Sequence, residues 1–210
     1  VVLLSGGMDS TMALLHALWE MEQNKLRCEV VALTFRYGQV HEIELAAARR
    51  VAKAMQVPHF VIDLGDALYV PAEPGAVVPG RNLMFLTAAA SWIEQSRTWS
   101  RSTLWLGVSH EDHLDFPDCR LAFLDSAEEC LGDAGLDVCI EAPFAEMSKH
   151  EAIEATLPKW PFVRDKRGLN DWPGGFFGFL EAETYSCYLG GFVHCGKCAA
   201  CIKRGDALDC

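Results

Sequence analysis

The order of hydrophobic and polar positions along the chain predicts strands that alternate with helices. Val1–Leu4 is a short, continuous apolar run, as expected for a parallel strand that is buried on both faces. The same reasoning predicts further strands at 28–35, 59–63, 102–108 and 136–141, and helices at 11–21, 41–55, 82–95, 120–131 and 148–156. This succession predicts an α/β fold, a doubly wound parallel sheet with helices on both faces.

Two stretches depart from this alternation. Residues 70–80 hold three prolines and two glycines, which predicts a loop. Residues 157–183 combine prolines and glycines with Trp and Phe, and we expect an irregular aromatic segment that serves as a lid or an interface. A surface loop over a small satellite core is an equal alternative. We therefore expect an α/β domain over 1–156 and a C-terminal segment over 157–210 packed on the same domain.

Composition narrows the class of protein. The chain has 210 residues and a formal net charge of -11, so it lacks the basic balance of proteins that grip nucleic acid, and we expect no nucleic-acid partner. No apolar run approaches the roughly 18 residues that a membrane span needs. A signal-peptide pattern is also missing. We expect a cytoplasmic protein with no membrane contact.

A glycine-rich motif, Ser5–Ser10 (SGGMDS), joins the first strand to the first helix. Glycines without Cβ atoms let backbone N–H groups close on an anion, and the helix N-terminus adds its positive dipole. Asp9 would be unusual beside a phosphate unless it caps the helix or touches Mg²⁺ or another cation. We expect the whole loop to bind the phosphates of ATP: Ser5, Gly6, Gly7, Met8, Asp9 and Ser10.

This motif resembles the PP-loop of the ATP pyrophosphatase superfamily. The resemblance implies an adenine nucleotide α-hydrolase-like fold. It also implies cleavage of ATP between the α- and β-phosphates, which gives an adenylated substrate and pyrophosphate.

Four cysteines crowd into the C-terminal region at Cys187, Cys195, Cys198 and Cys201. Two-residue gaps let neighbouring thiolates converge on one ion, and four sulfurs are typical of structural zinc. An iron–sulfur cluster also uses four thiolates and stays open at this point. Disulfides are disfavoured in the cytosol.

Further segments lie where the predicted strands end, and they include FRYGQVH after Thr34, VPGRN at 78–82, GVSHEDH at 107–113 and FPDCR at 116–120. Together with SCY at 186–188 and CGKCAAC at 195–201, they resemble the QueC (ExsB) family of 7-cyano-7-deazaguanine synthases over most of the chain.

The resemblance implies a ligase that uses ATP, Mg²⁺ and ammonia to turn a deazapurine carboxylate, through an amide, into a nitrile. It implies that Arg81 and Asn82 orient the nucleotide or the substrate, and that Asp112 and Asp118 recognise the guanine-like edge or hold Mg²⁺. Arg120 is expected to pair with a carboxylate, and Lys149 to reach the phosphates. The family is commonly homodimeric, so we expect a homodimer.

The sequence departs from the family pattern near the expected pocket. Ser109 stands where the family has Asn, Phe116 stands where it has Tyr, the stretch from Leu68 to Arg81 is short and the stretch from Pro158 to Thr184 is long. Two other functions therefore stay open. One is transfer of an adenylated deazapurine to a protein acceptor, and the other is sulfur transfer to tRNA by a PP-loop enzyme.

Overall fold

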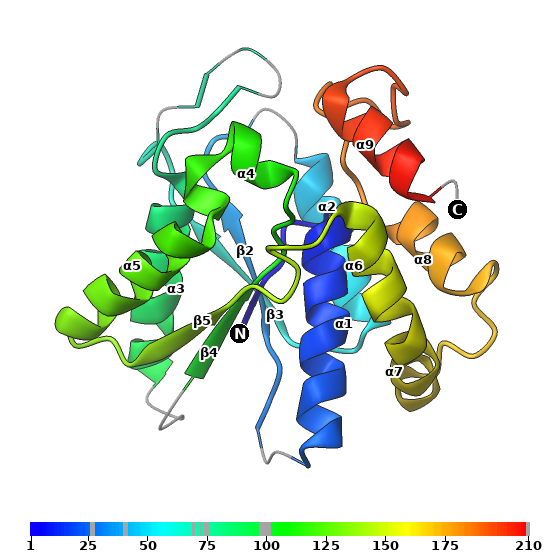
Figure 1. Ribbon diagram of the computed structural model, residues 1–210, viewed down its shortest axis with the longest axis horizontal. Helices are drawn as coiled ribbons and strands as arrows, with labels where there is room; N and C mark the ends of the chain where they lie inside the picture. The colour runs from blue at the N-terminus through cyan, green and yellow to red at the C-terminus, as the bar shows by residue number, and fades with distance from the viewer. Residues whose placement is uncertain are drawn as a thin grey trace.

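The computed structural model describes residues 1–25, 28–39, 42–68, 70–71, 73, 76–96 and 102–208. Within these ranges one parallel sheet has the strand order β3-β2-β1-β4-β5 (Figure 1). The strands are β1 (Val2–Leu3), β2 (Ala32–Arg36), β3 (His59–Asp63), β4 (Ser102–Leu106) and β5 (Val138–Glu141). The chain runs outward from β1 to β3 and then crosses to β4 on the other side of β1. Such a switch point places a ligand at the carboxyl ends of β1, β2 and β4.

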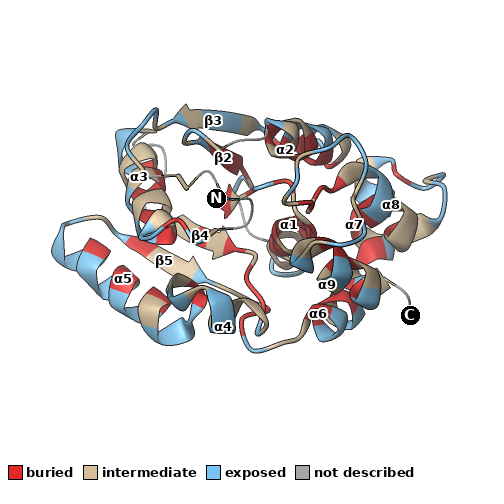
Figure 2. Cartoon of the chain, turned by 90° about the horizontal axis from the view of Figure 1, so that it is seen from above, coloured by how far each residue is buried: buried red, intermediate tan, exposed pale blue. Residues whose placement is uncertain are grey.

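Helices cover both faces of the sheet, as the sequence predicts. Figures 1 and 2 show α3 and α5 on one face, and α1 and α2 with α6, α7 and α8 on the other. The helices are α1 (Met8–Gln23), α2 (Ile43–Ala54), α3 (Arg81–Ser96), α4 (Asp112–Asp115), α5 (Leu121–Asp133), α6 (Lys149–Thr156), α7 (Trp160–Arg167), α8 (Gly175–Glu183) and α9 (Ala199–Leu208). Two short 3₁₀ helices, Pro117–Cys119 and Leu157–Lys159, precede α5 and α7.

The predicted elements before residue 157 are confirmed, with shifts at their ends. Helix α1 begins at Met8, three residues earlier than expected, so it starts inside the glycine-rich motif. The capping box at the start of α6 is present, because Ser148 and Glu151 bond each other's backbone N–H groups. None of the described residues of 70–80 belongs to a helix or strand.

The expectation of an irregular segment at 157–183 is wrong. The prolines and glycines there mark helix ends: Pro161 lies in the first turn of α7, and Gly168 ends that helix with a left-handed φ of 70°. Trp160 packs against Phe176 and Phe179 with ring centroids 5.6 and 5.0 Å apart. These rings share one hydrophobic core with α1 and α2, so the segment extends the main core.

None of the helices in the described ranges is long and apolar enough to cross a membrane.

One close backbone contact fixes where α1 begins relative to the sheet. Gly107 follows β4, and a Cβ atom there would lie 2.3 Å from both the carbonyl carbon of Asp9 and the amide nitrogen of Ser10. Because both neighbours are backbone atoms, no side-chain rotation relieves such a clash. The absence of a side chain at Gly107 therefore lets β4 approach the first turn of α1.

We predict that Gly107→Ala lowers the free energy of unfolding by about 3 kcal/mol, the upper range for overpacking a tight site. Gly132→Ala is the matched control, because it lies in α5 with no atom within 4 Å of an added Cβ. Gly132→Ala should be neutral or stabilising by up to about 1 kcal/mol. Urea denaturation measures both, and equal stability of the two variants would contradict the close contact.

Candidate functional site

The glycine-rich loop is closed by its own hydroxyl groups. The Ser10 hydroxyl accepts a hydrogen bond from the Ser5 backbone N–H at 3.2 Å and lies 3.0 Å from the Ser5 hydroxyl. The Ser5 hydroxyl in turn accepts from the Gly7 backbone N–H at 3.3 Å. Gly6 has a φ of +87°, which an L side chain rarely adopts. The loop is therefore preformed at the N-terminus of α1, as an anion site requires.

Neighbouring elements hold this loop from two sides. A Cβ at Gly6 would lie 2.5 Å from the Glu44 backbone oxygen and 2.6 Å from the Ala48 nitrogen, so α2 abuts the loop directly. The Gly6 carbonyl oxygen accepts a hydrogen bond from the Tyr185 N–H at 2.8 Å. A segment 179 residues further along the chain thus holds the glycine-rich loop in place.

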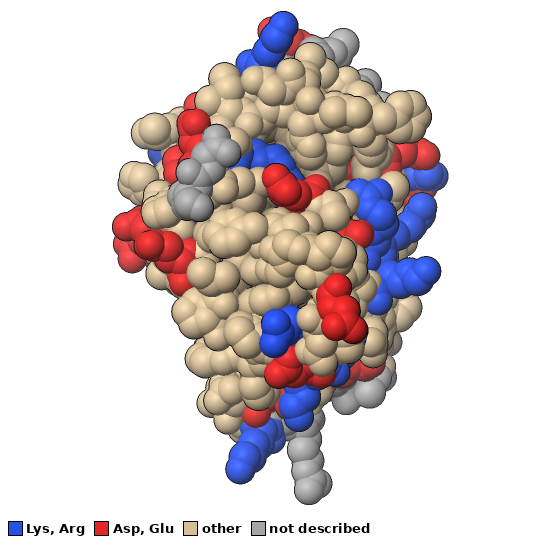
Figure 3. All heavy atoms as spheres, turned by 90° about the vertical axis from the view of Figure 1, so that its right-hand side faces the viewer, with Lys and Arg blue, Asp and Glu red and all other residues tan. Residues whose placement is uncertain are grey.

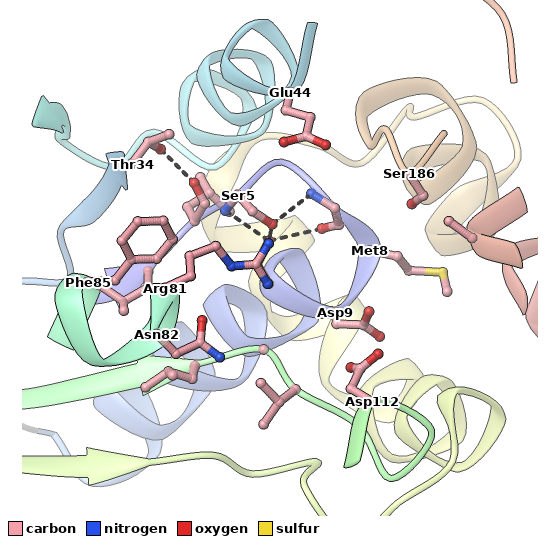
Figure 4. A pocket seen from close by; sticks show the side chains of 18 of the residues that line it. Ser5, Met8, Asp9, Thr34, Glu44, Arg81, Asn82, Phe85, Asp112 and Ser186 are labelled. Atoms are coloured by element: carbon pink, nitrogen blue, oxygen red, sulfur yellow. Dashed lines mark hydrogen bonds between the residues drawn. The ribbon is translucent and has the colours of Figure 1, made fainter. Parts of the chain in front are cut away.

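A cavity of about 280 Å³ opens over the loop at the carboxyl ends of β1, β2 and β4. Figure 4 shows that Arg81, Asn82 and Phe85 enter it from α3, Glu44 from α2, Asp112 from α4 and Ser186 from the C-terminal region. The cavity lies at the switch point of the sheet. Of the residues predicted to act in the site, the following line it: Ser5, Gly7, Met8, Asp9, Ser10, Arg81, Asn82, Asp112 and Lys149.

A buried charge cluster joins the loop to α6. The Lys149 ammonium lies 2.5 Å from Asp9 Oδ2, 3.8 Å from Asp112 Oδ2 and 3.2 Å from the Ser109 hydroxyl. Asp112 Oδ2 also accepts bonds from the Ser109 N–H and hydroxyl, each at 3.0 Å. Burial by itself lowers the pKa of Lys149, but the carboxylates of Asp9 and Asp112 outweigh it and raise that pKa. Lys149 is therefore charged at neutral pH and directed at the loop.

This cluster fits a divalent cation as well as phosphate. Asp9 Oδ1 is buried and has no hydrogen-bond partner among the described residues, although Oδ2 of the same carboxylate contacts Lys149. Figure 4 shows the carboxylates of Asp9 and Asp112 facing one another. Carboxylate oxygens are the ligands that Mg²⁺ uses together with substrate phosphates.

Arg81 and Asn82 occupy the start of α3, close to Asp118, which we also expected to act in the site. The Asn82 N–H donates to Asp118 Oδ2 at 3.0 Å, and its side-chain amide donates to the Asp118 carbonyl oxygen at 3.0 Å. Asp118 and Arg120 do not belong to the described residues that line the cavity. Arg120 is exposed, and its Nε donates to the His113 carbonyl oxygen at 3.0 Å. The geometry therefore makes Asp118 a residue that positions Asn82.

The two substitutions that depart from the family pattern, Ser109 and Phe116, lie close to the expected site residues. Ser109 is fully buried and holds Asp112 and Lys149, and it does not reach the cavity in the described chain. Phe116 does line the cavity, and its ring lies 5.8 Å from the Arg81 guanidinium carbon. Tyr37 also hydrogen-bonds Arg81. Arg81 thus contacts both an aromatic face and a phenol, which restricts its orientation.

Sequence reasoning missed the contribution of the C-terminal region to the cavity wall. Ser186 and Tyr188 flank a cysteine of the cluster and line the cavity, as do Lys203 and Arg204 of α9. Arg204 is buried and donates to the Thr184 hydroxyl at 2.6 Å. The SCY motif at 186–188 could have indicated this contribution, because it places two polar side chains directly beside a predicted metal ligand.

The four cysteines predicted to bind metal converge. The Sγ atoms of Cys187, Cys195, Cys198 and Cys201 all lie within 4.8 Å of one another. Cys195 Sγ and Cys201 Sγ are 3.8 Å apart, close to the about 3.8 Å expected for two thiolates on a tetrahedral zinc ion. The N–H groups of Lys197 and Cys198 donate to Cys195 Sγ and lower its pKa. The cluster is compatible with zinc.

On the face shown in Figure 3, acidic and basic side chains are interspersed, and several basic side chains gather near its right-hand edge.

We predict that Cys198→Ser lowers bound zinc far below one ion per chain and lowers Tm, because metal binding here stabilises the fold. Cys130→Ser is the control, since Cys130 is exposed on α5 outside the cluster and should change neither quantity. Metal analysis and thermal melts give both readouts. Iron with visible charge-transfer absorbance in the wild type would contradict zinc.

Comparison with known proteins agrees with this geometry. Residues 1–210 match the family model described as "Queuosine biosynthesis protein QueC". The chain is 33% identical to the 7-cyano-7-deazaguanine synthase of Synechococcus elongatus over 99% of this chain and 89% of that protein. It is 31% identical to the synthases of Microcystis aeruginosa, over 99% of this chain and 90% of that one, and of Hahella chejuensis, over 100% and 87%. The protein therefore belongs to the QueC family.

Proposed function

We propose that the protein is an ATP-dependent ligase that converts 7-carboxy-7-deazaguanine and ammonia into 7-cyano-7-deazaguanine. The observation that carries the proposal is the cavity. One wall is a preformed anion loop, and the others present Arg81, Lys149 and aromatic rings that suit a flat carboxylate substrate. The names of its relatives supply the product, 7-cyano-7-deazaguanine, and the carboxylate of the same deazapurine is the corresponding substrate.

The chemistry requires a carboxylate to become an electrophile. ATP, when bound, supplies the adenylyl group that turns one carboxylate oxygen into a leaving group. The loop N–H groups and the α1 dipole bind the phosphates, and Lys149 stabilises the charge that develops on them. Arg81, held by Tyr37 and Phe116, orients the substrate carboxylate or the α-phosphate, since a guanidinium pairs with either as a planar fork.

Mg²⁺ and zinc have separate roles in this proposal. Asp9 and Asp112 hold Mg²⁺ against the phosphates, where the ion offsets phosphate charge. The four cysteines hold zinc, which fixes Ser186 and Tyr188 on either side of Cys187 in the cavity wall. Zinc is therefore structural, because the four sulfurs leave no open position.

Mass spectrometry of one reaction tests the function directly. The protein is incubated with ATP, Mg²⁺, ammonium and 7-carboxy-7-deazaguanine, and the expected products are first the amide and then the nitrile, with AMP and pyrophosphate. Absence of acid-dependent AMP would remove the proposal. AMP release without amide or nitrile would instead support transfer to another acceptor, such as a protein.

We predict that Lys149→Met lowers acid-dependent ATP–pyrophosphate exchange by about 10²- to 10³-fold, the usual loss when one preorganised charge donor is removed. Met keeps most of the side-chain volume but removes the ammonium group that contacts Asp9 and Asp112. Lys53→Met, on the exposed end of α2, is the control and should exchange at the wild-type rate. Exchange by Lys149→Met at that same rate would contradict a role for Lys149 at the phosphates.

A further inference from the structure

Glu44 brings a carboxylate into the cavity from the side opposite the charge cluster. It lies in the first turn of α2, it is half-buried, and Figure 4 shows its carboxylate pointing into the cavity toward the loop near Ser5. Burial raises the pKa of the Tyr37 phenol in the cavity wall, and the Glu44 carboxylate adds a smaller effect in the same direction. The proposed mechanism above gives this carboxylate no task.

Two features hold Glu44 in place. The side chain of Gln39 closes the turn after β2, accepting from the Tyr37 N–H at 2.7 Å and donating to the Phe35 carbonyl oxygen at 3.0 Å. At the other end, the close approach of Gly6 to the Glu44 backbone oxygen fixes the first turn of α2 against the loop. The close approach of α2 to the loop thus places Glu44 beside the glycine-rich motif.

The other acidic side chains of the cavity already serve a different part of it. Among the described residues that line the cavity, these are Asp9 and Asp112, and both contact Lys149. They lie across the loop from Glu44 (Figure 4). The nitrogen source of the proposed reaction is ammonium at neutral pH, a cation that a carboxylate entering the cavity attracts.

We propose that Glu44 is a catalytic residue that binds ammonium beside the phosphate loop and takes protons from nitrogen; this inference rests on the proposed function. Ammonium gives one proton to the carboxylate, and the freed lone pair attacks the carbonyl carbon of the acyl adenylate. The C–N bond forms and the C–O bond to AMP breaks. The carboxylate, having passed the first proton to solvent, then takes the excess proton from nitrogen. The products are the amide and AMP.

The same position serves the second half of the reaction. The amide oxygen attacks the α-phosphorus of a second ATP, and pyrophosphate leaves. The two N–H protons are then removed as the C–O bond to AMP breaks and the C≡N bond forms. Because both halves need a proton acceptor at the same nitrogen, one carboxylate next to the loop suffices, and it returns each proton to solvent.

Glu44→Gln tests the proposal, because Gln keeps the shape of the side chain but neither attracts ammonium nor accepts a proton at neutral pH. We expect kcat/KM for ammonium to fall by about 10²-fold or more, the size of a general-base contribution. Acid-dependent ATP–pyrophosphate exchange without ammonium should stay near the wild-type rate, which would also show that the variant is folded. Hydroxylamine is uncharged at neutral pH, so hydroxamate formation should be largely retained.

The matched control is Glu42→Gln, two residues earlier. Glu42 is exposed, pairs with Arg36, and does not line the cavity in the described chain, so ammonium use should be unchanged. Loss of pyrophosphate exchange in Glu44→Gln would overturn the proposal, since it would place Glu44 in ATP binding. An equal loss with hydroxylamine and ammonium would overturn it too. Absence of exchange in the wild type would instead remove the proposed function.

Discussion

Close backbone packing around one loop is the constraint on which the rest of this structure depends. Gly6 admits α2 to the loop, and Gly107 admits the end of β4 to the first turn of α1. A Cβ at either position would overlap the backbone of the neighbouring element. These contacts bring the ends of three strands and the N-terminus of α1 to one point, and the cavity forms there because the strand order switches beside β1.

Long-range contacts then place charged side chains at this point. The Lys149–Asp9 ion pair joins residues 140 positions apart and directs an ammonium group at the loop. The hydrogen bond from the Tyr185 N–H to Gly6 brings in the C-terminal region, whose cysteine cluster carries two cavity-lining residues with it. The cysteine cluster and the glycine-rich loop therefore adjoin the same cavity, which explains why the family signature is spread along the whole chain.

The sequence predicted the alternating elements, the loop and the converging cysteines, because periodicity and local spacing determine each of them. It failed at 157–183, where prolines and glycines that end helices were taken for irregular structure. It predicted Asp118 in the site, whereas the Asp118 carboxylate accepts a hydrogen bond from the Asn82 N–H and is not among the described residues that line the cavity. It did not single out Glu44 or Arg204, which do line the cavity. Those positions depend on which segments meet across the sheet, and a single sequence does not encode that in its spacing.

The central claim is that the cavity adenylates first a carboxylate and then the amide made from it. Transfer of oxygen tests it most directly. When both carboxylate oxygens of 7-carboxy-7-deazaguanine carry ¹⁸O, each nitrile formed should leave two molecules of AMP, each with one ¹⁸O in its phosphate. Label that appears in pyrophosphate or in water, with unlabelled AMP, would contradict the account.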